Sequence, residues 1–483
     1  MDALVYAFTH TTLVVVILAA FQVAAVYFAF RAVKTARTPQ GAVGWVVFLF
    51  AAPHFAVPAF LFFGHARYPG YIRTRRAMAG IIAALRHDGE EELPALPDPE
   101  AAAIAQRLGA FERLVGIPAA RGNATRLLID GDATFAAMFE AIDAAQDYIL
   151  MQFYTIRDDE IGRAMGERLI ERAEAGVKVR VLYDSIGSSS LSSSYISRLR
   201  EAGVDIRNFH AIRHTRNRLQ VNFRNHRKIL VIDGATGFIG GHNLGDEYLG
   251  RDPKLGHWRD THLRLDGPAV AQLQLAFAED WLWSSGEKLA LEWRPDEVPE
   301  DRRVLILSTG PADKFETGSL YFANAIGAAR SRVWIATPYF VPDGDILTAL
   351  KLAAMRGVDV RILLPERPDH LLVWHAGLAY FDEVRAAGVK VMQYGKAQGF
   401  LHQKVVLVDE DFAVVGSHNL DNRSCRLNFE ASALVYDADF AAEVAQMLSR
   451  DMDLAHAVDT PLAKMGFWRS NFALAARVFA PVL

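Results

Sequence analysis

The 483-residue chain contains an internal repeat, and this repeat restricts the possible folds more than any other feature of the sequence. Three segments of the first half recur in the second half in the same order. The matching pairs are DYILMQFY (147–154) with SRVWIATPYF (331–340), EAGVKVRVLYD (174–184) with RGVDVRILLPE (356–366), and EAGVDI (201–206) with AAGVKV (386–391). Each set gives an amphipathic helix, a glycine and a β-branched strand, a succession typical of βαβ units. We therefore predict an α/β fold made of two similar domains with mixed or parallel sheets.

The extent of the repeats predicts the division of the chain. The predicted segments are a membrane anchor at 1–66, a linker with a helix leading into the body at 67–120, a first α/β domain at 121–285, a second at 303–450, and a C-terminal helix at 451–483. The polar segment 292–303 joins the two domains. Apolar residues recur at roughly helical spacing after Phe467, with Arg469 and Arg477 among them. This last helix is expected either to pack on the body or to lie in a membrane interface.

Each repeat also carries one copy of a polar motif. The copies are NHRKILVIDGATGFIGGHN (225–243) and LHQKVVLVDEDFAVVGSHN (401–419). In both, a lysine lies two residues, an aspartate seven residues and an asparagine seventeen residues after a histidine. These positions are His226, Lys228, Asp233 and Asn243 in the first copy and His402, Lys404, Asp409 and Asn419 in the second. A single His-x-Lys is more often a surface strand with a stray histidine, but two copies at identical spacing in duplicated domains indicate catalysis.

The residue types of this catalytic motif suit a phosphoryl group. The apolar, β-branched surroundings predict a strand, on which histidine and lysine share one face. Two lysines and two asparagines can hold the nonbridging oxygens of a tetrahedral phosphate and neutralise the charge of its transition state. One imidazole can attack phosphorus to form a phosphohistidine, while the other protonates the departing alkoxide and deprotonates the incoming hydroxyl. Asp233 and Asp409 have the opposite parity and end the strand, so we expect them to have a structural part in the motif.

We expect no metal ion and no cofactor at this site. Lysine is not a ligand for a divalent cation at neutral pH, and two lysines already balance the charge of a phosphate. The single cysteine, Cys425, excludes an intrachain disulfide and a cysteine-based zinc site.

The N-terminal end of the chain is strongly apolar. Residues 3–30 contain no Asp, Glu, Lys or Arg, and a second uncharged run covers 38–66. Because about 20 apolar residues cross a bilayer as a helix, we predict a membrane-embedded hairpin of two transmembrane helices; a cleaved signal peptide is the less favoured alternative. Pro53 and Pro58 leave room for a kinked or re-entrant second segment. Three cations between the two runs and five after them favour, by a narrow margin, a cytoplasmic body.

The paired motifs resemble those of the phospholipase D superfamily. The strings GGHNLGDEYLG (240–250), TPYFVPD (337–343) and GSHNLDNRSCRLNFE (416–430), with the two N-terminal apolar runs, are similar to bacterial cardiolipin synthases over essentially the whole chain. This resemblance implies two tandem phospholipase D-like α/β sandwich domains with mixed sheets behind a transmembrane helical hairpin. It implies a multi-pass protein of the bacterial inner membrane. The implied reaction joins two phosphatidylglycerol molecules into cardiolipin and glycerol through a covalent phosphatidyl-histidine intermediate.

The resemblance also implies roles for individual residues. His226 and His402 become the nucleophile and the acid–base pair, and His226 is chosen as the nucleophile because that role is often assigned to the first copy. The residues implied around the phosphate, or orienting the site, are Lys228, Lys404, Asn243, Asn419, Ser417, Asp260 and Glu430. A carboxylate usually orients such a histidine by accepting its second ring N–H. Glu430 is expected to serve His402, and Asp260 is expected to serve His226.

Three other functions remain open on the sequence. A phospholipase D-type lipid hydrolase, or another phosphatidyltransferase, would use the same residues with a different acceptor. A nuclease shares the motif, but 52 Lys and Arg against 56 Asp and Glu give a net charge of −4, which argues against a nucleic-acid partner. A non-enzymatic lipid-binding scaffold is the third possibility. The sequence makes no prediction of the oligomeric state.

Overall fold

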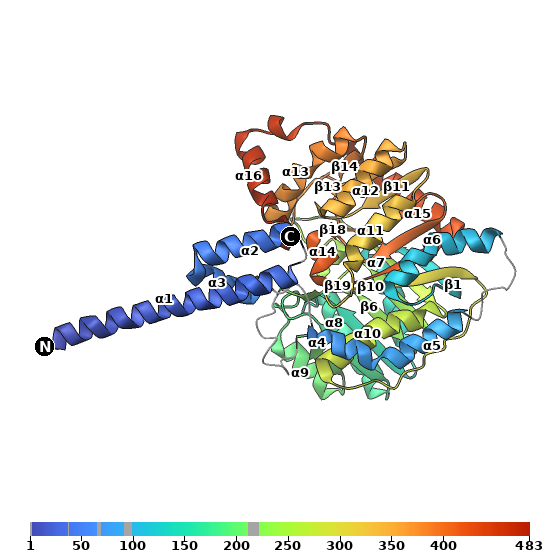
Figure 1. The fold of residues 1–483 in the computed structure, drawn as a ribbon. Coiled ribbons are helices and arrows are strands. Elements are labelled where there is room, and N and C mark those ends of the chain that lie inside the picture. The colour runs from blue at the N-terminus through green and yellow to red at the C-terminus, as the bar shows by residue number, and fades with distance from the viewer. Residues whose placement is uncertain (1, 37, 65–68, 91–98, 211–221) are drawn as a thin grey trace. The chain divides into compact units, whose positions relative to one another are not determined.

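The computed structural model describes residues 2–36, 38–64, 69–90, 99–210 and 222–483, and these form two compact units (Figure 1). The first is an N-terminal unit that extends to Arg73, and the second, the body, begins at Thr74 and contains both repeats. Residues 91–98 of the predicted linker lie outside the described residues, as do Arg37 and Arg67, two of the cations used to predict the orientation.

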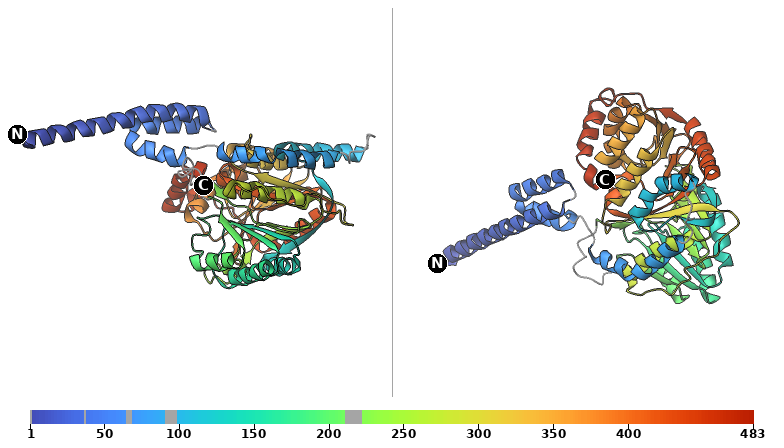
Figure 2. Two further views of the ribbon diagram at one scale, coloured as in Figure 1. Left: turned by 90° about the horizontal axis from the view of Figure 1, so that it is seen from below. Right: turned by 45° about the vertical axis from the view of Figure 1, so that its right-hand side comes forward.

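The N-terminal unit consists of apolar helices that pack side by side (Figure 2). Its helices are α1 (Asp2–Thr35), α2 (Pro39–Ala51) and α3 (Pro53–Phe63). Small side chains on α1, including Ala25 and Ala29, are buried in one cluster with Leu49 of α2 and Phe60 of α3. Among the described residues one helix, His10–Thr35, is long and apolar enough to cross a membrane.

The second apolar run differs from the prediction of one long span. Its helix stops at Ala52 and restarts at Pro53, because a proline ring disfavours helical backbone in the residue before it. The resulting helices α2 and α3 have 13 and 11 residues, each shorter than the length that crosses a bilayer. The structure therefore agrees with the first predicted transmembrane helix, whereas the second apolar run forms two short helices instead of one long one.

The first repeat begins after three helices, α4 (Pro69–Ala77), α5 (Ala79–Glu90) and α6 (Pro99–Val115). Its strands are β1 (Ala120–Ile129), β2 (Tyr148–Phe153), β3 (Lys178–Tyr183), β4 (Asp205–Asn208), β5 (Arg224–Asn225), β6 (Ile229–Ile232), β7 (Thr236–Gly240), β8 (Trp258–Arg259) and β9 (Thr261–Asp266). Its helices are α7 (Asp130–Ala144), α8 (Glu160–Glu174), α9 (Ser193–Glu201) and α10 (Ala269–Ser285).

The second repeat follows the same plan and extends it at the C-terminal end. Its strands are β10 (Arg302–Thr309), β11 (Arg332–Ala336), β12 (Phe340–Val341), β13 (Asp359–Pro365), β14 (Lys390–Tyr394), β15 (Phe400–Leu401), β16 (Val405–Val408), β17 (Phe412–Gly416), β18 (Leu420–Asp421), β19 (Asn428–Tyr436) and β20 (Ala455–Ala457). Its helices are α11 (Thr317–Ala328), α12 (Gly344–Met355), α13 (Leu371–Ala386), α14 (Asn422–Arg426), α15 (Ala438–Asp453) and α16 (Phe467–Arg477).

The two repeats arrange their strands in the same order. From the centre outwards the order is β1-β9-β7-β6-β2-β3-β4 in the first repeat and β10-β19-β17-β16-β11-β13-β14-β20 in the second, and β1 pairs with β10 at the centre. In each repeat three strands run parallel and the strands nearer the centre run antiparallel. Gly176 and Gly357 follow matching helices with φ of 95° and 88°, a left-handed conformation that suits glycine at a helix end. The predicted mixed α/β sheets are confirmed.

Apolar side chains place α10 and α15 between the sheets of the two repeats. One buried cluster combines residues of both helices, such as Trp281 and Phe440, with strand residues of both repeats, such as Leu265 and Val415. Two further clusters lie under the outer helices, one under α7, α8 and α9 and one under α11, α12 and α13. These outer helices, green and orange in Figures 1 and 2, cover opposite sides of the body. The layers form the predicted α/β sandwich.

Candidate active site

Each His-x-Lys motif lies between a strand that pairs with the other repeat and a strand that pairs within its own repeat. Before the first motif, β5 pairs in parallel with β19 of the second repeat; before the second motif, β15 pairs in parallel with β8 of the first. The His226 backbone N–H donates to the Phe429 carbonyl (2.8 Å), and the His402 N–H donates to the Arg259 carbonyl (2.8 Å). The prediction that each motif lies within a strand is therefore wrong. The backbone changes strand partners at the histidines, so β6 and β16 begin only after the lysines.

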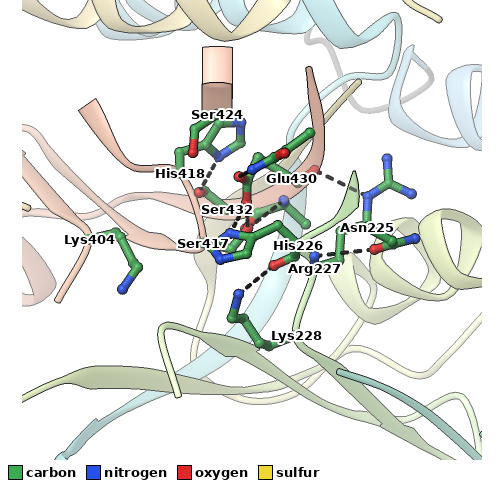
Figure 3. A network of polar contacts seen from close by, with 12 residues as sticks. Asn225, His226, Arg227, Lys228, Lys404, Ser417, His418, Ser424, Glu430 and Ser432 are labelled. Carbon is green, nitrogen blue, oxygen red and sulfur yellow. Dashed lines mark hydrogen bonds and ion pairs between the residues drawn. The ribbon is translucent and has the colours of Figure 1, made fainter. Parts of the chain in front are cut away.

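The two histidine–carboxylate pairs are crossed between the repeats. His226 Nδ1 lies 2.9 Å from Glu430 Oε2 (Figure 3), and His402 Nδ1 lies 2.7 Å from Asp260 Oδ2. The sequence identified the two carboxylates but assigned them to the wrong histidines. The strand pairing gives the reason: Glu430 follows Phe429, the residue that binds the His226 backbone, and Asp260 follows Arg259, which binds His402.

The motif lysines are buried beside the histidines. Lys228 Nζ donates to the His226 carbonyl at 2.6 Å. Lys404 Nζ contacts the His402 carbonyl and lies 2.6 Å from His402 Nδ1. Figure 3 shows the His226–Glu430 pair with Lys228 below it and Lys404 to the left, and the two ammonium groups interact electrostatically. The two motifs thus contribute to one site.

The motif aspartates lie at the other end of the strands β6 and β16. Asp233 accepts backbone N–H groups from Gln146, Asp147 and Tyr148, each at 2.8 Å. Asp409 accepts the matching N–H groups at the start of β11. Both residues have positive φ, 52° and 51°, which aspartate adopts more readily than most residues. Their carboxylates bind the backbone at the starts of β2 and β11, which agrees with the structural role expected for them.

The other predicted residues lie around the histidine pairs. Ser417 Oγ donates to Glu430 Oε2 at 2.6 Å, so it contacts the carboxylate that serves His226. Asn243 is held by the Thr155 N–H (3.2 Å) and donates to the Tyr248 hydroxyl (3.0 Å). Asn419 is buried, and its carbonyl oxygen has no hydrogen bond with any residue that the structure describes.

Comparison with known proteins identifies the family. A family model described as cardiolipin synthase, phospholipase D-like domain, matches residues 138–281 and 322–452. A protein of Pseudomonas fluorescens named cardiolipin synthase A is 47% identical over 461 residues, covering 94% of this chain and 95% of that protein. The chain belongs to the cardiolipin synthase family. A Pseudomonas aeruginosa member of this family, also named cardiolipin synthase A, is 47% identical over 451 residues, covering 92% of this chain and 91% of that protein.

A solved structure with a more distant sequence has the same fold. The crystal structure of phosphatidylserine synthase from Haemophilus influenzae aligns with a TM-score of 0.59 at 14% identity, covering 78% of this chain and 100% of that one. The cardiolipin synthase family thus shares its two-repeat fold with a protein of very different sequence.

Both orienting carboxylates are held in the ionised form. Burial raises the pKa of Glu430, but His226, His418 and Lys228 lower it to about 2. Burial likewise raises the pKa of Asp260, while Lys404, His242 and His402 bring it below its ordinary range. Burial lowers the pKa of His226, and burial together with Lys404 lowers that of His402 to about 3. Near neutral pH the free site therefore pairs two neutral imidazoles with two carboxylates.

The lysines respond to burial in the same way. Burial is the largest influence on both, lowering the pKa of Lys228 to about 7 and that of Lys404 to about 8. A phosphate anion bound between the lysines would favour their charged forms. The site is therefore suited to bind an anion and to concentrate positive charge around it.

Sequence reasoning missed the histidines behind the carboxylates, although both stand next to the motif asparagines. His418 binds the Ser432 hydroxyl (2.7 Å) and the Thr309 hydroxyl (2.8 Å), and it interacts electrostatically with Glu430. His242, its counterpart, lies with its ring centroid 5.6 Å from that of His262. Neither His242 nor His262 hydrogen-bonds through its ring to the residues that the structure describes.

Two buried arginine–aspartate pairs that the sequence did not indicate lie beside the histidines, and the second of them joins the two repeats. Arg227 binds Asp280 of α10 at 2.9 Å and also donates to the Glu430 carbonyl at 3.2 Å. Arg259 binds Asp451 of α15 through two contacts of 2.7 Å. The motif position that holds Arg227 in the first copy holds Gln403 in the second, and Gln403 also binds Asp451. Both repeats therefore anchor the site on a helix of the central layer.

Proposed function

We propose that this chain is a membrane-associated cardiolipin synthase that transfers a phosphatidyl group between two phosphatidylglycerol molecules. The observation that carries this proposal is the crossed arrangement of His226–Glu430 and His402–Asp260 with two buried lysines beside them. The similarity to proteins named cardiolipin synthase A over more than nine-tenths of the chain supports the choice of substrate.

In the first step, Nε2 of one histidine attacks phosphorus of the first phosphatidylglycerol. The bond from phosphorus to the headgroup glycerol oxygen breaks, and the other histidine protonates this oxygen as glycerol leaves. In the second step, the glycerol hydroxyl of the second phosphatidylglycerol gives its proton to the same acid–base histidine and attacks phosphorus. The phosphorus–nitrogen bond breaks, and the products are cardiolipin and the free nucleophile.

We assign His226 as the nucleophile and His402 as the acid and base. His226 Nδ1 lies against a carboxylate, so its N–H points to Glu430 and leaves the Nε2 lone pair for attack. At His402, Nδ1 donates its proton to Asp260, and burial together with the neighbouring Lys404 ammonium lowers the pKa of the ring. The phosphate of the bound substrate favours the imidazolium form of His402, which is then a strong acid. It gives its Nε2 proton to the leaving oxygen, and the neutral imidazole that remains accepts the proton of the incoming hydroxyl.

The remaining site residues have supporting roles in this proposal. Lys228, Lys404 and the amides of Asn243 and Asn419 stabilise the nonbridging oxygens as charge builds up in the transition state. Ser417, through its hydrogen bond to Glu430, orients the carboxylate rather than the phosphate. Asp233 and Asp409 hold the strand ends, and the chemistry needs no metal ion because the lysines carry the charge.

We further propose that the protein is a multi-pass protein of the bacterial inner membrane with its body on the cytoplasmic side. The apolar helix His10–Thr35 supports membrane association. The two short apolar helices after it suit a broken segment that enters the bilayer and returns, since each is too short to cross alone. Labelling of engineered cysteines from either side of sealed vesicles tests this topology.

The proposed activity is tested with purified protein, phosphatidylglycerol in detergent and mass analysis of the lipids. Cardiolipin and glycerol in equal amounts are the expected products. Phosphatidic acid as the main product would instead identify a lipid hydrolase, because water would then have taken the phosphatidyl group. Loss of both products in the His226→Ala variant distinguishes catalysis by this site from a contaminating enzyme.

A further inference from the structure

Helix α16 exposes its apolar side and packs on the protein through its small residues. Ala473 and Ala476 are buried against the body, and Arg477 donates to the Ala379 carbonyl of α13 at 3.3 Å. At 100° per residue, the large apolar side chains fall on the opposite side. Phe467 and Trp468 are 74% and 83% exposed, and Leu474 and Val478, the residue that follows the helix, are also exposed. Phe472 differs, because its ring packs against His375 of α13 with a centroid distance of 4.8 Å.

Such a face is unusual on a soluble surface. Large apolar side chains gathered on one face mark a site that binds another apolar phase or partner. On a helix, bulky aromatic and aliphatic residues facing outwards with basic residues at the flanks are typical of a segment that lies in a membrane interface. The body thus presents a face of this composition to its surroundings.

The charges around α16 favour an anionic lipid surface as the partner. Between Thr460 and Leu483 the chain has Lys464, Arg469 and Arg477 and no Asp or Glu. The Arg469 guanidinium lies over the Trp374 ring at 4.7 Å, and Arg477 lies over the Tyr380 ring at 4.3 Å while contacting Glu383 at 3.4 Å. The arginine stems lie along the protein side of the helix, at the border of the apolar face. Arg477 is paired with Glu383, so Lys464 and Arg469 carry the positive charge that favours anionic headgroups.

Helix α16 is connected to the second motif through a series of packed elements. Helix α13, on which α16 packs, contacts β12, and Phe340 of β12 lies against Tyr380 and Phe381 of α13. Strand β12 pairs with β18, which begins immediately after Asn419. The Arg423 N–H also donates to the Leu483 carbonyl at 2.7 Å. A membrane contact at α16 would therefore hold the body at a defined height.

We propose that α16 lies in the headgroup–acyl boundary of an anionic bilayer, with Trp468, Phe467 and Val478 among the lipid chains. This inference rests on the proposed function, because a lipid substrate gives the body a reason to be held at the membrane surface. It adds a second, peripheral membrane contact to the N-terminal apolar helix.

Spin labels test this contact in the full chain reconstituted in nanodiscs of phosphatidylglycerol and phosphatidylcholine. Trp468→Cys and Val478→Cys carry the labels, and Ser449→Cys on the exposed side of α15 is the matched control. The native cysteine, Cys425, is buried, and the unsubstituted chain serves as the labelling blank. Dissolved oxygen is expected to relax the labels at 468 and 478 more than a water-soluble nickel complex does, and the reverse is expected at 449.

Two results would overturn the proposal. Labels at 468 and 478 that respond like the control lie in water, and labels shielded from both reagents lie against protein, whether a second copy or another part of this chain. Neither readout depends on catalysis, so failure of the proposed function leaves the test intact.

A charge substitution gives a second test. The double variant Phe467→Glu, Trp468→Glu is expected to lose about tenfold of its cardiolipin formation on phosphatidylglycerol vesicles and to keep its activity in mixed detergent micelles, because only the vesicle requires interfacial insertion. Leu352→Glu combined with Met355→Glu, which places the same two charges at exposed apolar positions on α12, is the control. Equal activity of the double variant and the control on vesicles would contradict the proposal.

Discussion

The two repeats have the same strand order and contribute equivalent histidines, yet they surround the two orienting carboxylates differently. Glu430 accepts the Ser417 hydroxyl (2.6 Å) and the Asn428 amide (3.1 Å) as well as His226. Asp260 accepts the Thr261 backbone N–H (2.8 Å), the Trp258 indole N–H (3.4 Å) and His402. The carboxylate of the second repeat is thus held by side chains, whereas that of the first is held partly by the backbone N–H of the following residue.

One matched position near the end of each motif copy explains part of this difference. Gly241 of the first copy corresponds to Ser417 of the second. A Cβ at Gly241 would come within 2.0 Å of Asp260 Oδ1, so a side chain there cannot coexist with the present carboxylate position. The duplication thus kept the reacting groups and let the residues that support them diverge, which is what two different catalytic roles require.

Replacing the histidines should have the largest effect and should separate the two roles. His226→Ala and His402→Ala are each expected to reduce cardiolipin formation by at least about a thousandfold, since each removes a group that acts in both steps. A phosphodiester with a good leaving group, such as nitrophenolate, needs no acid. We therefore expect it to leave a phosphoryl adduct on His402→Ala and none on His226→Ala, measured by intact-protein mass. The opposite pattern would exchange the two roles.

Replacing one carboxylate tests the crossing itself. In Glu430→Gln, the pKa of His226 should fall further, because Glu430 raises it in the native protein, and activity should fall by about a hundredfold. The pKa of His402 should not change. Nitrogen NMR of labelled histidines reports both values, and a change at His402 instead of His226 would show that the carboxylate serves the other ring.

Exchanging the residues at positions 241 and 417 makes the surroundings of each orienting carboxylate resemble those of the other. Gly241→Ser should reduce kcat by about tenfold or more, because the new side chain displaces Asp260. Ser417→Gly removes one hydrogen bond to Glu430 and should cost only a few-fold. Steady-state kinetics on both variants, with thermal unfolding as the control for folding, measure the difference. Equal losses would show that the two supports are equivalent.

The pKa values of the two motif lysines predict how kcat/KM depends on pH. With pKa values of about 7 and about 8, Lys228 and Lys404 are charged below these values and lose charge as the pH rises through them. Binding of an anionic lipid needs the charge, so kcat/KM should fall from about pH 7 upwards, since kcat/KM reports groups of the free enzyme. Lys228→Arg should move this decline to higher pH at a lower maximum, because arginine keeps its charge. A profile that is flat to pH 9 would contradict this reading.

Removal of divalent cations should have the smallest effect. If the lysines carry the charge of the phosphate, EDTA should leave the rate of cardiolipin formation unchanged in a detergent assay. A large loss that added metal restores would overturn the metal-free mechanism.

Local sequence patterns were sufficient to predict most of the fold. The matched segments that contain β2 and β11, and β3 and β13, were recognised because apolar periodicity and a terminal glycine are properties of neighbouring residues. The same holds for Asp233 and Asp409, whose position at a strand end follows from counting along the strand. The break at Ala52 is only partly predictable from sequence, since a proline permits a kink or a stop and the surrounding packing decides between them.

The crossed histidine–carboxylate pairs could not be predicted from local sequence patterns. His226 and Glu430 lie 204 residues apart, and they meet because β5 pairs with a strand of the other repeat. Each repeat read by itself offers its own carboxylate to its own histidine, which is the assignment that proved wrong. His242 and His418 recur sixteen residues after the motif histidines, so the repeat itself marks them, but only their burial beside the carboxylates shows what they contact.

The exchange of carboxylates has a consequence for any ancestor that consisted of one repeat. Such a chain would have a histidine with no acid beside it and an acid with no histidine, and two copies would have to associate symmetrically to complete either. Its activity would disappear on dilution, as that of any obligate dimer does. Joining the copies in one polypeptide removes the dependence on concentration, and it allows one copy to mutate without changing the other.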